Sequence, residues 1–314
     1  DDAAWLARAA LVSLTASNAV PPRGQESVFK RYAALKPDAP NKPISRLATL
    51  DWISLRPHGY NQVVGELLVL LTGLPSMISG VPRPPDGGGA SSPVPLSMFR
   101  ALTDSLGVEG VTLVRESVTR LAVVDESRTL LRLDDGDGRA RTAFEVQGRL
   151  AMAAALAHPA HRPLALASRK DLLAIVSGVA HYLRLPERTS IPKPDSVSAE
   201  RGAAFPAALE RTSQAGLTRI RTLYASASEG LKDGLKAWAL DVEATLYRIA
   251  LLYMHDINHM DRFVRQGPAP ALARWLGQAK PEDTMRDLRG FSVSEAHVTL
   301  RKKLGLSSRA RFSW

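Results

Sequence analysis

Helix-forming sequence dominates the second half of the chain, and this pattern restricts the fold more than any other feature. Apolar residues recur at helical spacing from Gly148 onward and predict helices over residues 150–157, 166–185, 206–228, 231–265 and 269–276. The earlier sequence predicts helices over residues 5–16, 62–72 and 95–106. We therefore expect a mainly α fold, a helical bundle with its principal core between about residue 150 and residue 276.

Between these two groups of helices, the spacing of apolar residues changes to one typical of β-strands. The runs 111–114, 118–124, 129–133 and 143–146 are rich in β-prone residues. Between the last two runs, the Asp-Gly pairs of residues 134–138 supply the positive φ angles that tight hairpins need. We expect a small antiparallel β-hairpin element near residues 111–146, with the hairpin itself over 128–146. The same aspartates do not form a calcium loop, because Gly136 and Gly138 or Arg139 occupy required ligand positions.

Two stretches rich in proline or glycine separate the predicted segments of the chain. Residues 79–95 hold five prolines and four glycines in seventeen positions, the composition of a linker or an exposed loop. A second proline-rich stretch covers residues 186–198. The expected organisation is an N-terminal helical segment (1–78), a linker (79–95), a main helical domain with the hairpin (96–285) and a basic C-terminal segment (286–314).

Charge indicates a class of partner and not a reaction. The chain has 41 Lys and Arg against 31 Asp and Glu, a net charge of +10 and a pI near 10.1, which favours polyanions. It has no cysteine, which excludes disulfides, thiolate zinc sites and cysteine nucleophiles. No phosphate-binding glycine loop, dinucleotide fingerprint or nucleophile elbow occurs. We therefore expect no cofactor, no enzyme activity and, since its most apolar run (63–78) is short, no membrane span.

The sharpest local pattern lies in the helix expected over residues 231–265. His255 and His259 are four residues apart, and Arg248 and Arg262 lie seven residues before and after His255, so the four share one helix face. Three interpretations stay open: a solvated polar face, a contact with phosphates, or a metal site. The opposite face is apolar and should be buried, and it comprises Trp238, Val242, Leu246, Ile249, Tyr253, Ile257 and Met260.

Two short resemblances support the metal interpretation. The spacing of His255 and His259 resembles the H-E-x-x-H helix of zinc proteases, with Asp256 where the glutamate base stands. The apolar run 249–252 and the pair His255-Asp256 also resemble HD-type phosphohydrolases. The resemblances imply a metal-dependent hydrolase with these two histidines as ligands. Further members of such a site are sought among His181, Asp283, Asp287, Glu295 and His297.

The basic C-terminal segment is a further candidate for binding nucleic acid. Residues 286–314 carry seven basic and two acidic residues, interleaved with Phe291, Phe312 and Trp314. Basic side chains neutralise phosphates and aromatic rings stack on unpaired bases, although the same charges also suit a solvated surface. The candidate nucleic-acid-binding residues of the whole chain are Arg219, Arg221, Arg248, His255, His259, Arg262, Arg301, Lys302 and Lys303.

These features favour a nucleic-acid-binding structural protein. We expect a subunit of the coat or nucleocapsid type that packages single-stranded nucleic acid, RNA favoured, as a homo-oligomer. Its place would then be a virion or nucleoprotein particle, and otherwise intracellular. Two alternatives remain: the metal-dependent hydrolase of an anionic substrate, and a basic subunit of a ribonucleoprotein assembly.

Overall fold

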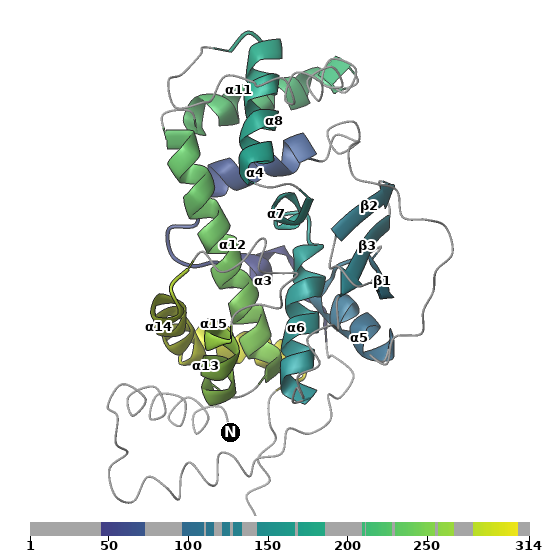
Figure 1. The fold of residues 1–314 in the computed structure, drawn as a ribbon, viewed down its shortest axis with the longest axis vertical. Coiled ribbons are helices and arrows are strands. Elements are labelled where there is room, and N and C mark those ends of the chain that lie inside the picture. Colours follow the sequence, from purple (N-terminus) through teal and green to yellow (C-terminus); the bar gives the residue numbers. More distant parts are fainter. Residues whose placement is uncertain are drawn as a thin grey trace, which may run out of the picture.

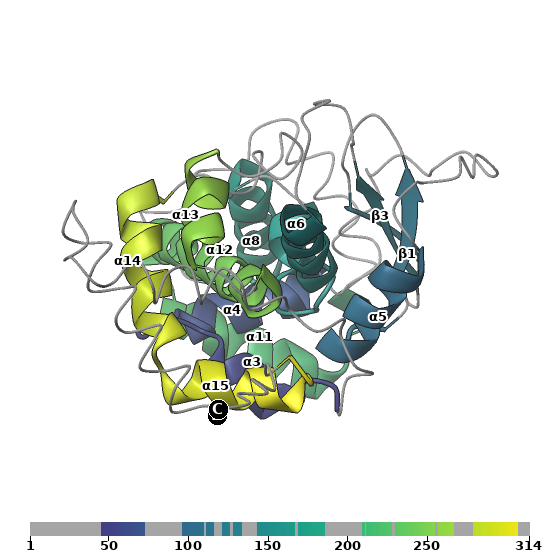
Figure 2. The same cartoon turned by 90° about the horizontal axis from the view of Figure 1, so that it is seen from below.

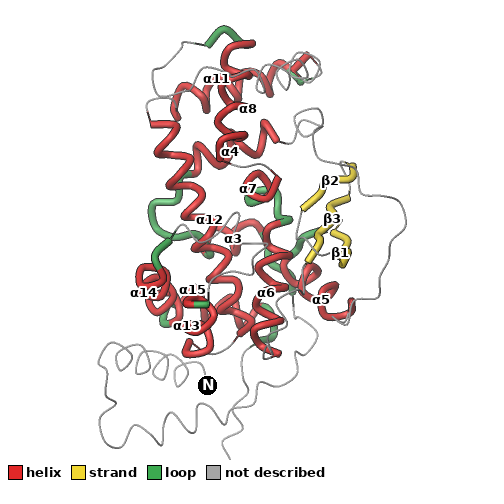
Figure 3. The backbone as a smooth tube through the Cα atoms, in the orientation of Figure 1, coloured by secondary structure: helices red, strands yellow, loops and turns green. Residues whose placement is uncertain are grey.

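Helices make up most of the fold. The structure, a computed structural model, describes residues 45–72, 96–109, 111–115, 121–125, 128–133, 143–166, 169–185, 209–210, 212–227, 230–254, 257–266 and 279–306. These residues form eleven helices and one small sheet (Figure 3). The prediction of a mainly α fold is confirmed. The helices expected over 5–16 and 269–276, both proline-rich stretches and the turn at 134–138 lie outside the described residues.

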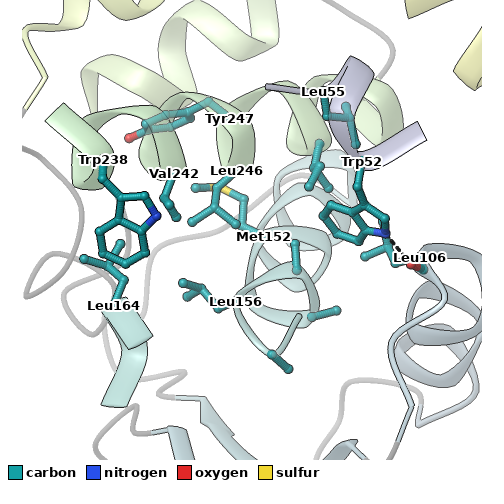
Figure 4. Close-up of a cluster of buried hydrophobic side chains, with 14 of the residues drawn as sticks. Trp52, Leu55, Leu106, Met152, Leu156, Leu164, Trp238, Val242, Leu246 and Tyr247 are labelled. Atoms are coloured by element: carbon teal, nitrogen blue, oxygen red, sulfur yellow. Dashed lines mark hydrogen bonds between the residues drawn. The ribbon is translucent and has the colours of Figure 1, made fainter. Parts of the chain in front are cut away.

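Helix α12 (Leu231–Met254) is the central element, and the other helices surround it (Figure 1). Its predicted apolar face is confirmed, because Trp238, Val242 and Leu246 are fully buried. Helix α6 (Ala143–Leu156) packs against it so closely that a Cβ atom at Gly148 would lie 2.5 Å from the sulfur of Met254. Met152 and Leu156 of α6 lie in the same buried cluster as Leu246 (Figure 4).

The remaining helices gather at the two ends of α12. Near one end lie α4 (Gln62–Thr72), α7 (Arg162–Leu166), α8 (Arg169–Tyr182) and α11 (Gln214–Ala227). Near the other lie α13 (Ile257–Arg265), α14 (Pro281–Ser292) and α15 (Glu295–Lys303). Viewed from below, α3 (Thr49–Ser54) lies beside α15, and α5 (Leu96–Leu106) lies next to the sheet (Figure 2).

The described N-terminal and C-terminal residues share one core with the middle of the chain. Trp52 and Leu55 of the first described segment and Leu288 and Leu300 near the other end belong to the same buried cluster as α12. The indole nitrogen of Trp52 donates a hydrogen bond of 3.2 Å to the carbonyl oxygen of Leu106 (Figure 4). Both ends of the described chain are therefore attached to the main core of the molecule.

The β element differs from the prediction. Strands β1 (Val111–Arg115), β2 (Leu121–Asp125) and β3 (Arg128–Leu133) form a sheet in the order β1-β3-β2. β1 pairs with β3 in parallel, with Val111 opposite Thr129, and β2 pairs with β3 antiparallel. The predicted antiparallel hairpin over 128–146 is not supported, because residues 143–146 begin helix α6. The alanine-rich run that continues to Leu156 favours a helix. The buried residues of this helix belong to the same cluster as those of α12.

The helix predicted over residues 231–265 is two helices in the structure, α12 and α13. His255 and Asp256, between them, lie outside the described residues. The predicted helix over 62–72 is confirmed with the same bounds as α4, and that over 95–106 is confirmed as α5. Among the described residues, no helix has the length and apolar character that a membrane crossing requires.

Candidate functional site

A groove of about 710 Å³ lies between the segment that follows α3 and the face of α14. Its walls carry Ile53, Arg56, Pro57, His58 and Tyr60 on one side and Arg286, Gly290 and Phe291 on the other, with Arg248 and Asp287 between them. Three arginines and one histidine thus face a single aspartate. This arrangement makes the groove a basic site.

The first wall is shaped by a tight change of chain direction. α3 is anchored by Trp52 and Leu55, which are 5% and 0% exposed, and this leaves Ile53 at the surface. Pro57 then follows, and Gly59 has a φ of 84°, a left-handed conformation that glycine adopts at little cost. The turn brings the guanidinium group of Arg56 over the ring of Tyr60, at 4.4 Å from the ring centre. This stacking orders the Arg56 side chain before any ligand arrives.

Tyr60 is itself held by the core. Its hydroxyl oxygen accepts a hydrogen bond of 3.1 Å from the indole nitrogen of Trp238. Burial raises the pKa of Tyr60 above its usual value, so its hydroxyl stays neutral at physiological pH. The cation and ring pair of Arg56 and Tyr60 is therefore a fixed part of the wall.

The second wall is the exposed side of α14. This helix has Pro281 at its start, acidic Glu282 and Asp283 in its first turn and Arg289 in its last turn, the charge order that the helix dipole favours. Arg286 donates a 3.0 Å hydrogen bond to Asp283, and the two side chains are 80% and 57% exposed. Exposed pairs of this kind contribute little stability, so an incoming anion can replace Asp283.

Arg248 joins the two walls. Its guanidinium group is ion-paired with Asp287 of α14, including a hydrogen bond of 2.8 Å from Nε to the carboxylate. It also donates to the backbone carbonyl oxygens of Leu55 at 3.3 Å and Arg56 at 2.8 Å. The ring of Phe291 lies 5.0 Å from the same group. Arg248 is 8% exposed, and these bonds use four of its five N–H donors.

The charges of the groove therefore fall into two classes. The charge of Asp287 is balanced by Arg248 in the floor. Arg56 is paired with no carboxylate among the residues the structure describes, and Arg286 has only an exposed partner. Two guanidinium groups on opposite walls thus remain for a ligand, with an exposed histidine, His58, beside them.

The residues that the sequence suggested do not gather at this site. Arg248 is at its floor, and it is buried, not on an exposed stripe with Arg262, which is exposed on α13. Arg301 is also buried, and it donates to the carbonyl oxygens of Leu252, at 2.6 Å, and Leu306. The first contact satisfies a carbonyl group near the C-terminus of α12 and the second one just after α15, which gives Arg301 a structural place in the fold.

The other suggested residues lie on several separate elements. Arg219 is exposed and ion-paired with Glu66 of α4, whereas Arg221 is exposed on α11. Lys303 is ion-paired with Asp51 of α3, and Lys302 is exposed beside it. His259 is half-buried on α13.

The described residues do not assemble the metal site. They contain no group of three side chains placed to hold a metal ion, and His255 and Asp256 lie outside them. His297 is fully buried against the ring of Phe291, with the ring centres 5.2 Å apart, and Glu295 is exposed.

Sequence reasoning missed Arg56, His58 and Tyr60, and it counted Arg286 only as part of a basic segment. The run from Arg56 to Tyr60 does carry a local signal, since a cation, a proline, a histidine, a glycine and an aromatic residue follow one another. No family model, curated protein or solved structure matches the chain. The geometry of the groove therefore gives the best indication of function.

Proposed function

We propose that this protein binds single-stranded nucleic acid, RNA favoured, as a repeated structural subunit, and that the groove contacts the strand. The observation that carries the proposal is the placement of Arg56 and Arg286 on opposite walls, where no buried carboxylate of the described residues neutralises them. Guanidinium groups match phosphate geometry and can bind it through two hydrogen bonds. The net charge of +10 supplies the long-range attraction that such binding needs.

The test is the affinity for a single-stranded RNA of mixed sequence, measured by fluorescence anisotropy over a range of salt concentrations. Affinity should fall steadily with salt, because phosphate contacts release bound counterions. The double variant Arg56→Ala/Arg286→Ala should bind about ten-fold more weakly or worse at moderate salt, since a hydrogen bond to a charged group contributes about 1.5–3 kcal/mol.

Arg100→Ala is the matched control. Arg100 is an exposed arginine on α5, away from α14 in both views (Figures 1 and 2), so its loss changes the net charge without touching the groove. An equal loss of affinity in Arg100→Ala and in each single groove variant would assign the binding to overall charge and reject the groove. No measurable binding by the unmodified protein at low salt would reject the function itself.

A further inference from the structure

The walls of the groove carry both charged and apolar side chains. Arg56 and Arg286 place charge on the two walls, whereas Ile53, Pro57 and Phe291 give the lining an apolar component. A site that bound phosphate alone would have no use for this apolar surface. The combination suits a ligand whose charged part and flat apolar part are joined, as they are in a nucleotide.

From this combination we infer that the groove takes unpaired nucleotides, with their bases against the apolar side chains and their phosphates at Arg56 and Arg286. The inference rests on the proposed function and specifies what the site recognises. A volume of about 710 Å³ lies within the range of roughly 300–1,000 Å³ typical of small-molecule sites. That space suits the bases of a short stretch of strand, whereas a base within a duplex is stacked and paired and cannot enter.

Two groups are placed to contact a base. Ile53 is 48% exposed on a helix whose neighbouring side chains, Trp52 and Leu55, are buried in the core, so it presents a fixed apolar surface to the groove. The guanidinium group of Arg56 lies over the ring of Tyr60, and the side of this group that faces away from the ring can stack on a base. Neither contact reads a base edge, so binding should tolerate any sequence.

A strand without bases separates this inference from simple phosphate binding. The probes are a single-stranded oligothymidylate and an oligomer of the same length whose nucleotides are abasic, with every phosphate retained. The protein should bind the abasic oligomer about ten-fold more weakly at the same salt concentration, with a similar salt dependence. Equal affinities for the two would overturn the inferred contact with the bases and leave the proposed function standing. Failure to bind either would instead reject the proposed function.

A pair of variants on one helix gives a second readout. Ile53 lines the groove, and Leu50, three residues earlier, is 75% exposed and does not line it. Ile53→Ala should weaken binding of oligothymidylate by about three-fold or more and leave binding of the abasic oligomer unchanged. Leu50→Ala should change neither. The inference fails if Ile53→Ala binds oligothymidylate as the unmodified protein does, or if it weakens both probes alike.

Discussion

Arg248 connects three segments that are far apart in the sequence. It extends from α12 to Asp287 of α14 and to the backbone of Leu55 and Arg56. Lysine cannot reproduce these bonds, because it has one ammonium group in place of a planar fork. We expect Arg248→Lys to lower the free energy of unfolding by about 2 kcal/mol and to weaken nucleic-acid binding, measured by denaturant titration and by anisotropy.

Arg301→Lys is the control, since Arg301 is equally buried and bonded to carbonyl oxygens but lies outside the groove lining. It should lose comparable stability and keep its affinity. Similar losses of affinity in both variants would show that Arg248 has no special part in positioning the walls.

A single glycine fixes the junction between α5 and the segment before α3. Gly107 has a φ of 67°, and a Cβ atom there would lie 2.8 Å from the carbonyl oxygen of Leu47. Gly107→Ala should therefore lower the free energy of unfolding by about 2 kcal/mol, from the left-handed backbone and the clash together. Gly230→Ala is the comparison, because nothing lies within 4 Å of the added atom, and its denaturation midpoint should stay the same or rise. If Gly107→Ala unfolds with the same free energy as the unmodified protein, the expected strain at this position is wrong.

The site also marks the limit of sequence reasoning about residues. Helical periodicity correctly assigned the buried face of α12. It placed Arg248 on a polar stripe, for which solvent, phosphate contact and a metal site all stayed open, and it did not predict that Arg248 is buried by other segments. Periodicity shows which residues share a helix face, and it does not show which distant segments cover that face. Arg248 is buried by Asp287, thirty-nine residues later in the sequence, and by the carbonyl groups of Leu55 and Arg56, more than 190 residues earlier.

At the scale of elements, α3 is attached to the molecule through a cluster of rings. Trp52 stacks on His158, with ring centres 4.0 Å apart, and meets His161 edge-on at 5.4 Å. Burial, with smaller contributions from neighbouring positive charge, lowers the pKa of His158 to about 3 and that of His161 to about 4. Both histidines are therefore neutral in the folded protein and take up protons near pH 6.5 when it unfolds.

This difference makes stability depend on pH. Because the folded pKa values lie below the unfolded value, the unfolded state binds more protons, and stability is lost as the pH falls below about 6.5. Each histidine should contribute a slope of roughly 1.4 kcal/mol per pH unit, measured by denaturant unfolding between pH 6.5 and pH 5. His158→Phe, which keeps a ring against Trp52, should reduce this slope, and His181→Asn, at an exposed position on α8, should not. An unchanged slope in His158→Phe would show that protonation of His158 does not cause the pH dependence of stability.

Elements with a strong local pattern were predictable, and those defined by long-range pairing were not. The apolar run of α4 is closed by a glycine and a proline, and its predicted bounds were correct. Residues 143–146 look β-prone in isolation, but they start a longer alanine-rich helix. The parallel pairing of β1 with β3 joins segments separated by β2, and no short-range signal specifies such a pairing.

At the scale of the whole molecule, charge should couple nucleic-acid binding to assembly. Copies that each carry a net charge of +10 repel one another, and a bound polyanion removes that repulsion. Long single-stranded RNA added to nuclease-treated protein should therefore produce large assemblies, measured by sedimentation velocity. A dinucleotide should not produce them, because it can occupy one groove but cannot neutralise or connect several copies. Assemblies of the same size without RNA would contradict the coupling, and binding without any assembly would favour a basic subunit of a mixed ribonucleoprotein over a coat-type subunit.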